Sequence, residues 1–206
     1  MARWETGAQE RLAKAAYELY LERGYEKVTV AEIATRAGLT KRTFFRYFAD
    51  KREVLFSGAA AFQQQVVSSV LEAPVGIAPV DAVIAALSIG GTSLAALGEL
   101  ARQRQRLIDT STDLQEREMI KMASLTDAIG GALRERGISE PVPTLTAQAG
   151  VAVFKIAFER WAGREGTVEF PPLLYQALAE LRAAVGPVPP DDAPTASDVP
   201  RLGASN

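Results

Sequence analysis

Apolar residues recur at intervals of three and four along most of this chain, and runs of alternating apolar and polar residues are nearly absent. This spacing places apolar side chains on one face of an α-helix, whereas a half-buried strand would alternate. Near the N-terminus the apolar stripe consists of Leu12, Ala15, Ala16 and Leu19. The pattern therefore predicts an all-α protein.

Capping signals divide the first part of the chain into short helices. Gly24 fits the left-handed residue that follows the end of a first helix. Thr29 and Glu32 have the spacing of a capping box, which predicts that a second helix begins there. This second helix is short, because Gly38 ends it.

A glycine turn then leads into a third helix. Gly38 lies where a side chain would clash between two steeply crossing helices, and Thr40 is a favoured N-cap for a helix over residues 41–48. Phe44 and Phe48 are four residues apart and share the back of that helix. A short helix, a turn and a second short helix packed on a longer one is the arrangement of a helix-turn-helix DNA reader.

The front of the third helix carries cations and one further aromatic ring. Lys41, Arg42, Phe45 and Arg46 point away from the core, toward solvent or DNA. A single cation on a short helix is commonly only solvated surface, and for Arg46 alone both interpretations stay open. Combined with the capped helices and the aromatic back, these residues predict a DNA-binding surface.

Further helices are expected down to a polar tail. Asp50 and Glu53 repeat the capping pattern before a fourth helix whose apolar stripe ends near Val70. Other helices are expected at about residues 79–86, 94–108, 112–135, 145–162 and 171–185. Residues 187–206 are rich in proline, aspartate and small residues, and we expect them to be disordered.

The formal charge is −2, but it is unevenly distributed. Residues 1–52 contain eleven Lys/Arg and seven Asp/Glu, a net charge of +4, while the remainder contains twelve and eighteen, a net charge of −6. Such asymmetry suggests a basic N-terminal unit that meets a polyanion.

The chain contains neither cysteine nor histidine. Thiol nucleophiles, imidazole bases and Cys/His zinc sites are therefore excluded, so we expect no catalytic residues, no metal ligands and no cofactor. We also find no signal-peptide pattern and no run of about 18 uninterrupted apolar residues. These features predict a soluble, cytoplasmic protein with no membrane partner.

The segment TVAEIATRAGLTKRTFFRYFADKREVL resembles the N-terminal domain of the TetR family of transcriptional regulators. The family pattern is matched without a gap at Thr29, Ile33, Ala34, Ala37, Gly38, Leu39, Thr40, Thr43, Phe44, Phe45, Tyr47, Phe48, Asp50, Lys51 and Leu55. The resemblance covers about residues 8–56. Beyond it, the chain is similar to the family in helical content, in length and in a tryptophan late in the penultimate helix, Trp161.

The resemblance implies roles for residues of the first three helices. The hydroxyl of Thr29, with the helix N-terminus behind it, can hold a DNA phosphate. Tyr47 and Lys51 are expected to contact the DNA backbone, with Lys51 at the start of the fourth helix. The residues expected to face DNA on the third helix are Thr40, Lys41, Arg42, Thr43 and Arg46.

Two positions depart from the usual family pattern. Phe45 stands where tyrosine is common, so a phosphate hydrogen bond is lost and packing against the sugar remains. Arg42 stands where a small residue is common, so the base preference is expected to differ from that of relatives.

The last two expected helices are candidates for a dimer interface. Residues 149–158, AGVAVFKIAF, are apolar around most of the helix, which exceeds one core-facing stripe. In the family these helices pack against their copies as a four-helix bundle, and this chain is similar. The alternative is that both are central core helices of a monomer.

The resemblance also implies an effector site among the middle helices. The candidate lining residues are Phe62, Leu97, Arg104, Met122, Thr126, Phe158 and Trp161. All of them could equally be packed core. Arg104 could meet an anionic or carbonyl-bearing effector, but the favoured alternative is that its head reaches water or pairs with an acid.

We therefore expect a helix-turn-helix DNA-binding domain at residues 1–52 and a helical effector-binding and dimerisation domain at 53–186. The expected function is that of a dimeric repressor of an inverted-repeat operator, released when an effector tilts a lever helix over residues 51–70. Three alternatives remain: an enzyme built on a helical bundle, a helix-turn-helix protein without an effector, and an activator.

Overall fold

The computed structural model describes residues 3–166 and 168–186, and the side chains from residue 7 onward. The predicted disordered tail, 187–206, lies outside the described residues. The described part is all-α, as predicted, and has no strand. Its helices are α1 (Arg3–Arg23), α2 (Val30–Arg36), α3 (Lys41–Tyr47), α4 (Ala59–Leu71), α5 (Pro79–Ala95), α6 (Glu99–Asp109), α7 (Thr112–Glu135), α8 (Val142–Ala162) and α9 (Phe170–Val185).

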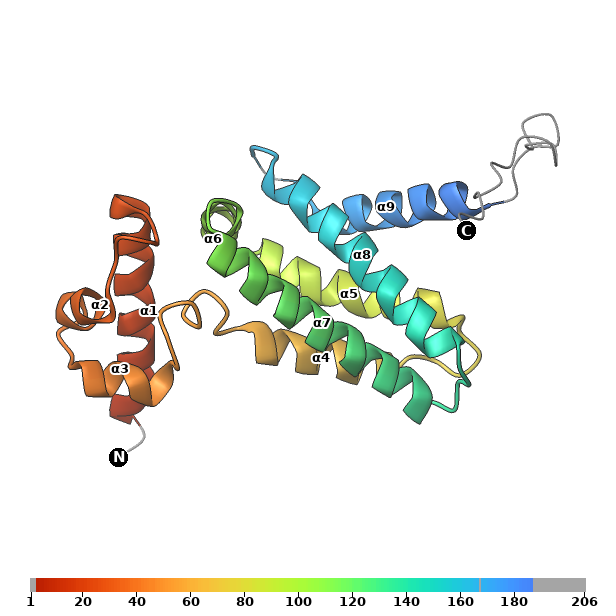
Figure 1. Ribbon diagram of the computed structural model, residues 1–206. Helices are drawn as coiled ribbons and strands as arrows, with labels where there is room; N and C mark the ends of the chain where they lie inside the picture. Colours follow the sequence, from red (N-terminus) through yellow and green to blue (C-terminus); the bar gives the residue numbers. More distant parts are fainter. Residues whose placement is uncertain (1–2, 167, 187–206) are drawn as a thin grey trace, which may run out of the picture.

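Two groups of helices lie side by side (Figure 1). Helices α1–α3 form the head, and helices α4–α9 form the body, with the segment 48–58 between them. One hydrophobic cluster fills the head and extends to Leu107, Ile108 and Leu114 of α6 and α7. A second cluster fills the body. The predicted domain boundary at residue 52 falls in the connecting segment and stays a prediction.

The predicted capping of the head helices is confirmed. Gly24 has a φ of +82°, the left-handed conformation that glycine adopts without strain. The Thr29 side chain accepts from the backbone N–H of Glu32, and the Glu32 carboxylate accepts from the N–H of Thr29 at 2.9 Å. The Thr40 side chain caps α3 by accepting from the N–H of Thr43 at 3.1 Å.

The prediction that the fourth helix begins near Asp50 is wrong, since α4 begins at Ala59. Asp50 does accept from the N–H groups of Arg52 and Glu53, but the chain continues in bends and turns. In these turns the N–H of Leu55 bonds the carbonyl of Arg52, three residues back, instead of four. The Glu53 carboxylate pairs with α7 and does not complete a capping box.

The predicted break after residue 86 is also wrong, because α5 continues to Ala95. Its glycines allow close packing and do not end the helix. A Cβ atom on Gly90 would lie 2.7 Å from the Phe62 ring, and one on Gly91 would lie 2.1 Å from the Phe170 ring. Only glycine lets these rings approach the α5 backbone so closely.

The remaining helix predictions differ little from the structure. α6 begins at Glu99 and not at residue 94, after Gly98 with a φ of +57°. α8 begins at Val142 and not at residue 145, and Pro143 lies in its first turn, where a missing N–H removes no helical hydrogen bond. Among the described residues no single helix is long and apolar enough to span a membrane. Only the pair α5 and α6, which is bent by 99°, has the length and composition of a membrane span when the two helices are taken together.

Polar contacts at the α6–α7 corner hold the head to the body. The hydroxyl of Tyr25 donates to Asp113 at 2.8 Å, and Arg52 donates to the other oxygen of the same carboxylate at 2.7 Å. Ser111, which is buried, donates to Glu26 at 2.7 Å. The head is therefore fixed at this corner by hydrogen bonds as well as by the shared apolar cluster.

Candidate functional site

The turn between α2 and α3 is held from behind by α1. Arg11 donates from Nε to the carbonyl oxygen of Ala37, the C-cap of α2, at 3.1 Å. Gly38 has a φ of +66°, and a Cβ atom there would lie 3.0 Å from the Arg11 guanidinium. Both the backbone conformation and the close approach require glycine, so the angle between α2 and α3 is fixed.

The back of α3 is buried and its front is exposed. Phe44 and Phe48 are 0% and 4% exposed, with ring centroids 5.4 Å apart, and they belong to the head cluster with Leu19, Ile33 and Ala37. Phe45 lies on the other side and is 56% exposed, with its ring edge-on to Phe44 at 5.5 Å. The buried rings thus hold this helix of two turns rigidly.

The start of α3 presents free cations beside capping hydroxyls. Lys41 and Arg42 are exposed, and neither has a hydrogen bond or ion pair within the described part of the chain. The hydroxyls of Thr40 and Thr43 lie 3.0 Å apart beside them. Two unpaired cations at the N-terminus of a rigid helix attract phosphates and base edges of DNA.

Most other cations of the head are already engaged. Arg46 donates to the hydroxyl of Tyr47 at 2.9 Å, and its guanidinium carbon lies 4.9 Å from the Tyr47 ring. Arg23 pairs with Glu32 and Arg36 with Glu22. Among the described side chains of the head, cations without a partner therefore lie chiefly at the start of α3.

Lys51 has an internal position that the sequence did not suggest. Its ammonium group bonds the carbonyl oxygens of Tyr25 at 2.9 Å, Glu26 at 3.3 Å and Val28 at 3.0 Å, and it lies 4.1 Å from the Tyr25 ring. All three N–H donors of the ammonium have partners. Lys51 therefore fixes the loop before α2, where the exposed Thr29 stands. Its predicted phosphate contact stays a prediction.

The sequence interpretation missed Lys27. This residue is exposed, two positions before Thr29, and has no hydrogen bond or ion pair among the described residues. A lysine just before a helix N-terminus is a weak signal, since most such residues are only solvated surface. Its lack of a partner becomes visible only in the structure.

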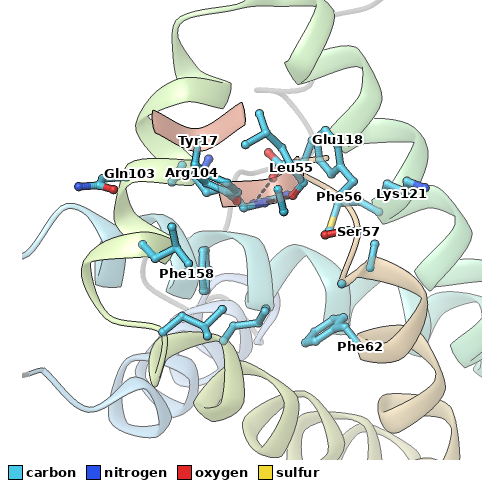
Figure 2. Close-up of a pocket in the computed structure, with 18 of the residues that line it drawn as sticks. Tyr17, Leu55, Phe56, Ser57, Phe62, Gln103, Arg104, Glu118, Lys121 and Phe158 are labelled. Carbon is cyan, nitrogen blue, oxygen red and sulfur yellow. Dashed lines mark hydrogen bonds and ion pairs between the residues drawn. The ribbon is translucent and has the colours of Figure 1, made fainter. Parts of the chain in front are cut away.

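A cavity of about 640 Å³ lies between α1, the end of the connecting segment and the body (Figure 2). In the figure Tyr17, Arg104 and Glu118 lie at one end, and Phe62 and Phe158 lie at the other. Most of the remaining wall is apolar, from Ala13, Leu21, Leu94, Leu97, Leu100, Met122 and Phe154. The cavity is thus a largely apolar site with a few polar groups in its wall, as ligand sites commonly are.

Five of the seven predicted ligand-binding residues line this cavity, and two do not. The five are Phe62, Leu97, Arg104, Met122 and Phe158. Thr126 lies elsewhere, with its hydroxyl donating to the carbonyl of Met122 at 3.0 Å. Trp161 is 1% exposed, and its indole N–H donates to the carbonyl of Val168 at 2.9 Å. The tryptophan therefore holds the loop before α9 and does not line this cavity.

Arg104 reaches the cavity, and two of its three guanidinium nitrogens have partners. Nε donates to the carbonyl of Leu55 at 2.8 Å, and Nη1 lies 3.4 Å from a carboxylate oxygen of Glu118. The guanidinium also lies over the Phe56 ring, 4.8 Å from its centroid. The interpretation in which Arg104 pairs with an acid is therefore confirmed.

Two family descriptions match the chain. The bacterial regulatory proteins of the tetR family match residues 12–57, and the C-terminal domain of MftR matches residues 77–186. The chain belongs to the TetR family. Members of this family are transcriptional regulators and not enzymes, so the enzyme alternative is excluded.

Curated relatives and solved structures agree with this assignment. MftR of Mycobacterium tuberculosis, whose name assigns it to mycofactocin biosynthesis regulation, is 27% identical over 153 residues, covering 73% of this chain and 77% of MftR. The regulator TcmR of Streptomyces glaucescens is 36% identical over 74 residues, but the match spans only 36% of this chain and 33% of TcmR.

The solved structures are similar in fold at low sequence identity. A complex of SmeT with triclosan superposes with a TM-score of 0.62 at 19% identity, covering 86% of this chain and 90% of SmeT. A TetR-family protein of Syntrophomonas wolfei superposes with a TM-score of 0.62 at 18% identity, covering 88% of this chain and 96% of that protein. These structures support the fold, a helix-turn-helix head and a helical body, and the family matches make the chain a DNA-binding TetR-family regulator.

Proposed function

We propose that this TetR-family protein is a cytoplasmic dimeric repressor that binds an inverted-repeat operator and leaves it when a small molecule occupies the cavity. The observation that carries the DNA-binding part is the pair of exposed, unpartnered cations Lys41 and Arg42 at the start of a rigid α3. With Thr40, Thr43 and Phe45 they form the α3 face. This face would enter the major groove, where arginine and lysine read guanine at about 1–3 kcal/mol of discrimination.

The flanks of the α3 face would contact the DNA backbone. Thr29 is exposed at the N-terminus of α2, and Lys27 stands just before it. A helix N-terminus and a nearby ammonium both favour phosphate. Tyr47 and Arg46, which are joined by a hydrogen bond, form the opposite flank. Backbone contacts of this kind set the register of the base-reading helix.

An apolar stripe on α8 and α9 supports dimerisation. Leu145 is 60% exposed and Ile156 45% exposed on α8, and Tyr175 is 50% exposed on α9. The exposed alanines Ala152 and Ala179 continue the same faces. The opposite faces of both helices are buried in the body, so the interpretation as core helices accounts for one side only. A second copy packed on this stripe would hold two α3 faces about one DNA turn, 34–36 Å, apart.

The cavity supports the effector part of the proposal. It is large enough for a small molecule and has an apolar wall, and SmeT, which shares the fold, is described in complex with triclosan. Since its wall includes the connecting segment and α1, a bound molecule would alter how the head is held.

Two measurements test this proposal. Sedimentation of the purified protein should give a dimer, and Ile156→Asp should give a monomer with unchanged helicity and weaker operator binding. A monomeric wild-type protein at micromolar concentration would contradict dimerisation. Small molecules found to bind should lower operator affinity by the factor of 5–150 typical of coupled sites, while unchanged affinity would leave a repressor without an effector.

A further inference from the structure

The cavity lies across the joint between head and body and not within the body alone. Ala13, Tyr17 and Leu21 of α1 form its head side, and Phe62 and Phe158 lie opposite on α4 and α8. α1 belongs to the same rigid cluster as α3. A molecule in this cavity would therefore touch the DNA-binding unit itself.

The charges of the cavity wall are balanced and mostly paired. The wall contains four acids and four bases: Glu10, Glu18, Glu118, Glu159, Lys14, Arg104, Lys121 and Lys155. Each base has an acidic partner, at 3.4 Å for Arg104–Glu118, 3.2 Å for Lys121–Glu53, 4.0 Å for Lys14–Glu18 and 3.7 Å for Lys155–Glu159.

The bases of the wall are thus already close to acids, and Glu10, which has no ion pair among the described residues, is exposed to water. A charged ligand would lose its hydration in a largely apolar site and would have to compete with the acids that already pair with the bases. The wall therefore disfavours charged molecules of either sign.

Tyr17 is a polar group of the cavity wall that has no partner of its own among the described residues. It is half-buried in the wall, and its hydroxyl has no hydrogen-bond partner among the described residues. Burial raises the pKa of this phenol, and the nearby Arg104 charge offsets that only in part, so the hydroxyl stays protonated and can donate. Ser57, which is exposed, and Gln103, which is half-buried, also line the cavity.

We infer that the cavity binds an uncharged, mostly apolar small molecule whose oxygen accepts a hydrogen bond from Tyr17, and that this molecule acts on α1 directly. The regulatory half of this inference rests on the proposed function, whereas the ligand class and the site do not. The signal passes from the ligand to the head through α1 and needs no tilt of a continuous lever helix. This agrees with the turns that interrupt the chain between α3 and α4.

The test uses Nile red, a neutral apolar dye with a carbonyl oxygen, and the full chain without DNA. We expect saturable binding with a blue-shifted emission, weakened about fivefold by Tyr17→Phe, the size expected for one lost hydrogen bond. Ala13→Trp, which fills the cavity from its head side, should abolish binding. Ala123→Trp, at an exposed position of α7 outside the cavity wall, is the matched control and should bind normally.

Equal Nile red affinity in the wild type and in Ala13→Trp would contradict the assignment of the binding site to this cavity. If the anionic dye anilinonaphthalene sulfonate binds more tightly than Nile red, and Ala13→Trp abolishes its binding, the conclusion that the ligand is uncharged is contradicted. If Nile red binds as expected but operator affinity stays unchanged, the site and the ligand class are supported and release by an effector fails. If Nile red weakens operator binding of the wild type and not of Ala13→Trp, the whole inference is supported.

Discussion

Arg104 of α6 bonds the backbone of the segment that joins the head to the body. Its Nε donates to the carbonyl oxygen of Leu55 at 2.8 Å, and the Phe56 ring lies beneath the guanidinium. The connecting segment is therefore held by a side chain of the body in place of the hydrogen bonds of a continuous helix. Because Arg104 also lines the cavity, one residue links the site to the path of the chain.

Replacement of Arg104 by methionine should destabilise the protein by about 1–3 kcal/mol, since the Leu55 carbonyl and Glu118 lose a charged donor in a partly buried place. Urea unfolding followed by circular dichroism measures this. Arg106→Met is the matched control: Arg106 pairs with Glu99 on an exposed surface, so its loss should change stability by less than about 0.5 kcal/mol. Equal effects would show that the Arg104 contacts contribute nothing of their own.

Gly91→Ala should destabilise the body by about 1–3 kcal/mol, because the added methyl group would overlap the Phe170 ring. Gly131→Ala on α7 provides the contrast, since nothing lies within 4 Å of its Cβ position. That change should stabilise the protein by about 0.5–1 kcal/mol through helix propensity. In thermal unfolding, Gly91→Ala should lower the melting temperature and Gly131→Ala should raise it. An unchanged melting temperature for Gly91→Ala would argue against the close contact.

Lys41→Ala and Arg42→Ala should each weaken operator binding and leave stability unchanged, because both side chains are exposed and unpartnered. If a residue contacts phosphate, the slope of log affinity against log salt should fall by about 1, uniformly across sequences. If it reads a base, discrimination at one position should fall by about 1–3 kcal/mol. Lys155→Ala, on the body, should change neither quantity. Fluorescence anisotropy at graded salt distinguishes these outcomes.

Stability should fall in acid partly through Glu53. Burial by itself would raise the pKa of this carboxyl, but hydrogen bonds from Arg117 and Lys121 outweigh it and hold the pKa below its ordinary value of 4.5. A pKa that is lower in the folded state stabilises the fold above about pH 4.5, and this contribution is lost as pH falls through the folded value. Glu53→Gln should therefore reduce the acid dependence of the unfolding free energy below pH 4.5. An unchanged pH profile would contradict this assignment.

The head was predictable from the sequence because its signals are local. A capping box, a left-handed glycine and aromatic residues four apart each depend on a few neighbouring positions, and the structure has all three. The start of α4 and the length of α5 were not predictable. They depend on contacts distant in sequence, namely Arg104 with Leu55, and Gly91 with Phe170.

The candidate sites, too, were predictable only where the signal is local in sequence. Apolar spacing identified Phe62, Met122 and Phe158, which do line the cavity. It could not separate a wall residue from a core residue, so its candidates also included Trp161, which is packed in the core outside this cavity. Tyr17 was missed because a tyrosine on the first helix gives no sign that it faces the body across the joint.

The central claim is that the α3 face of a dimer reads a specific DNA sequence. Selection of genomic fragments by the purified protein, followed by binding of the enriched fragment at graded salt, tests it most directly. We predict an inverted repeat with half-sites about one helical turn apart and an affinity that falls steeply with salt. If no fragment is enriched even at low salt, the role of the α3 face as a DNA reader is contradicted.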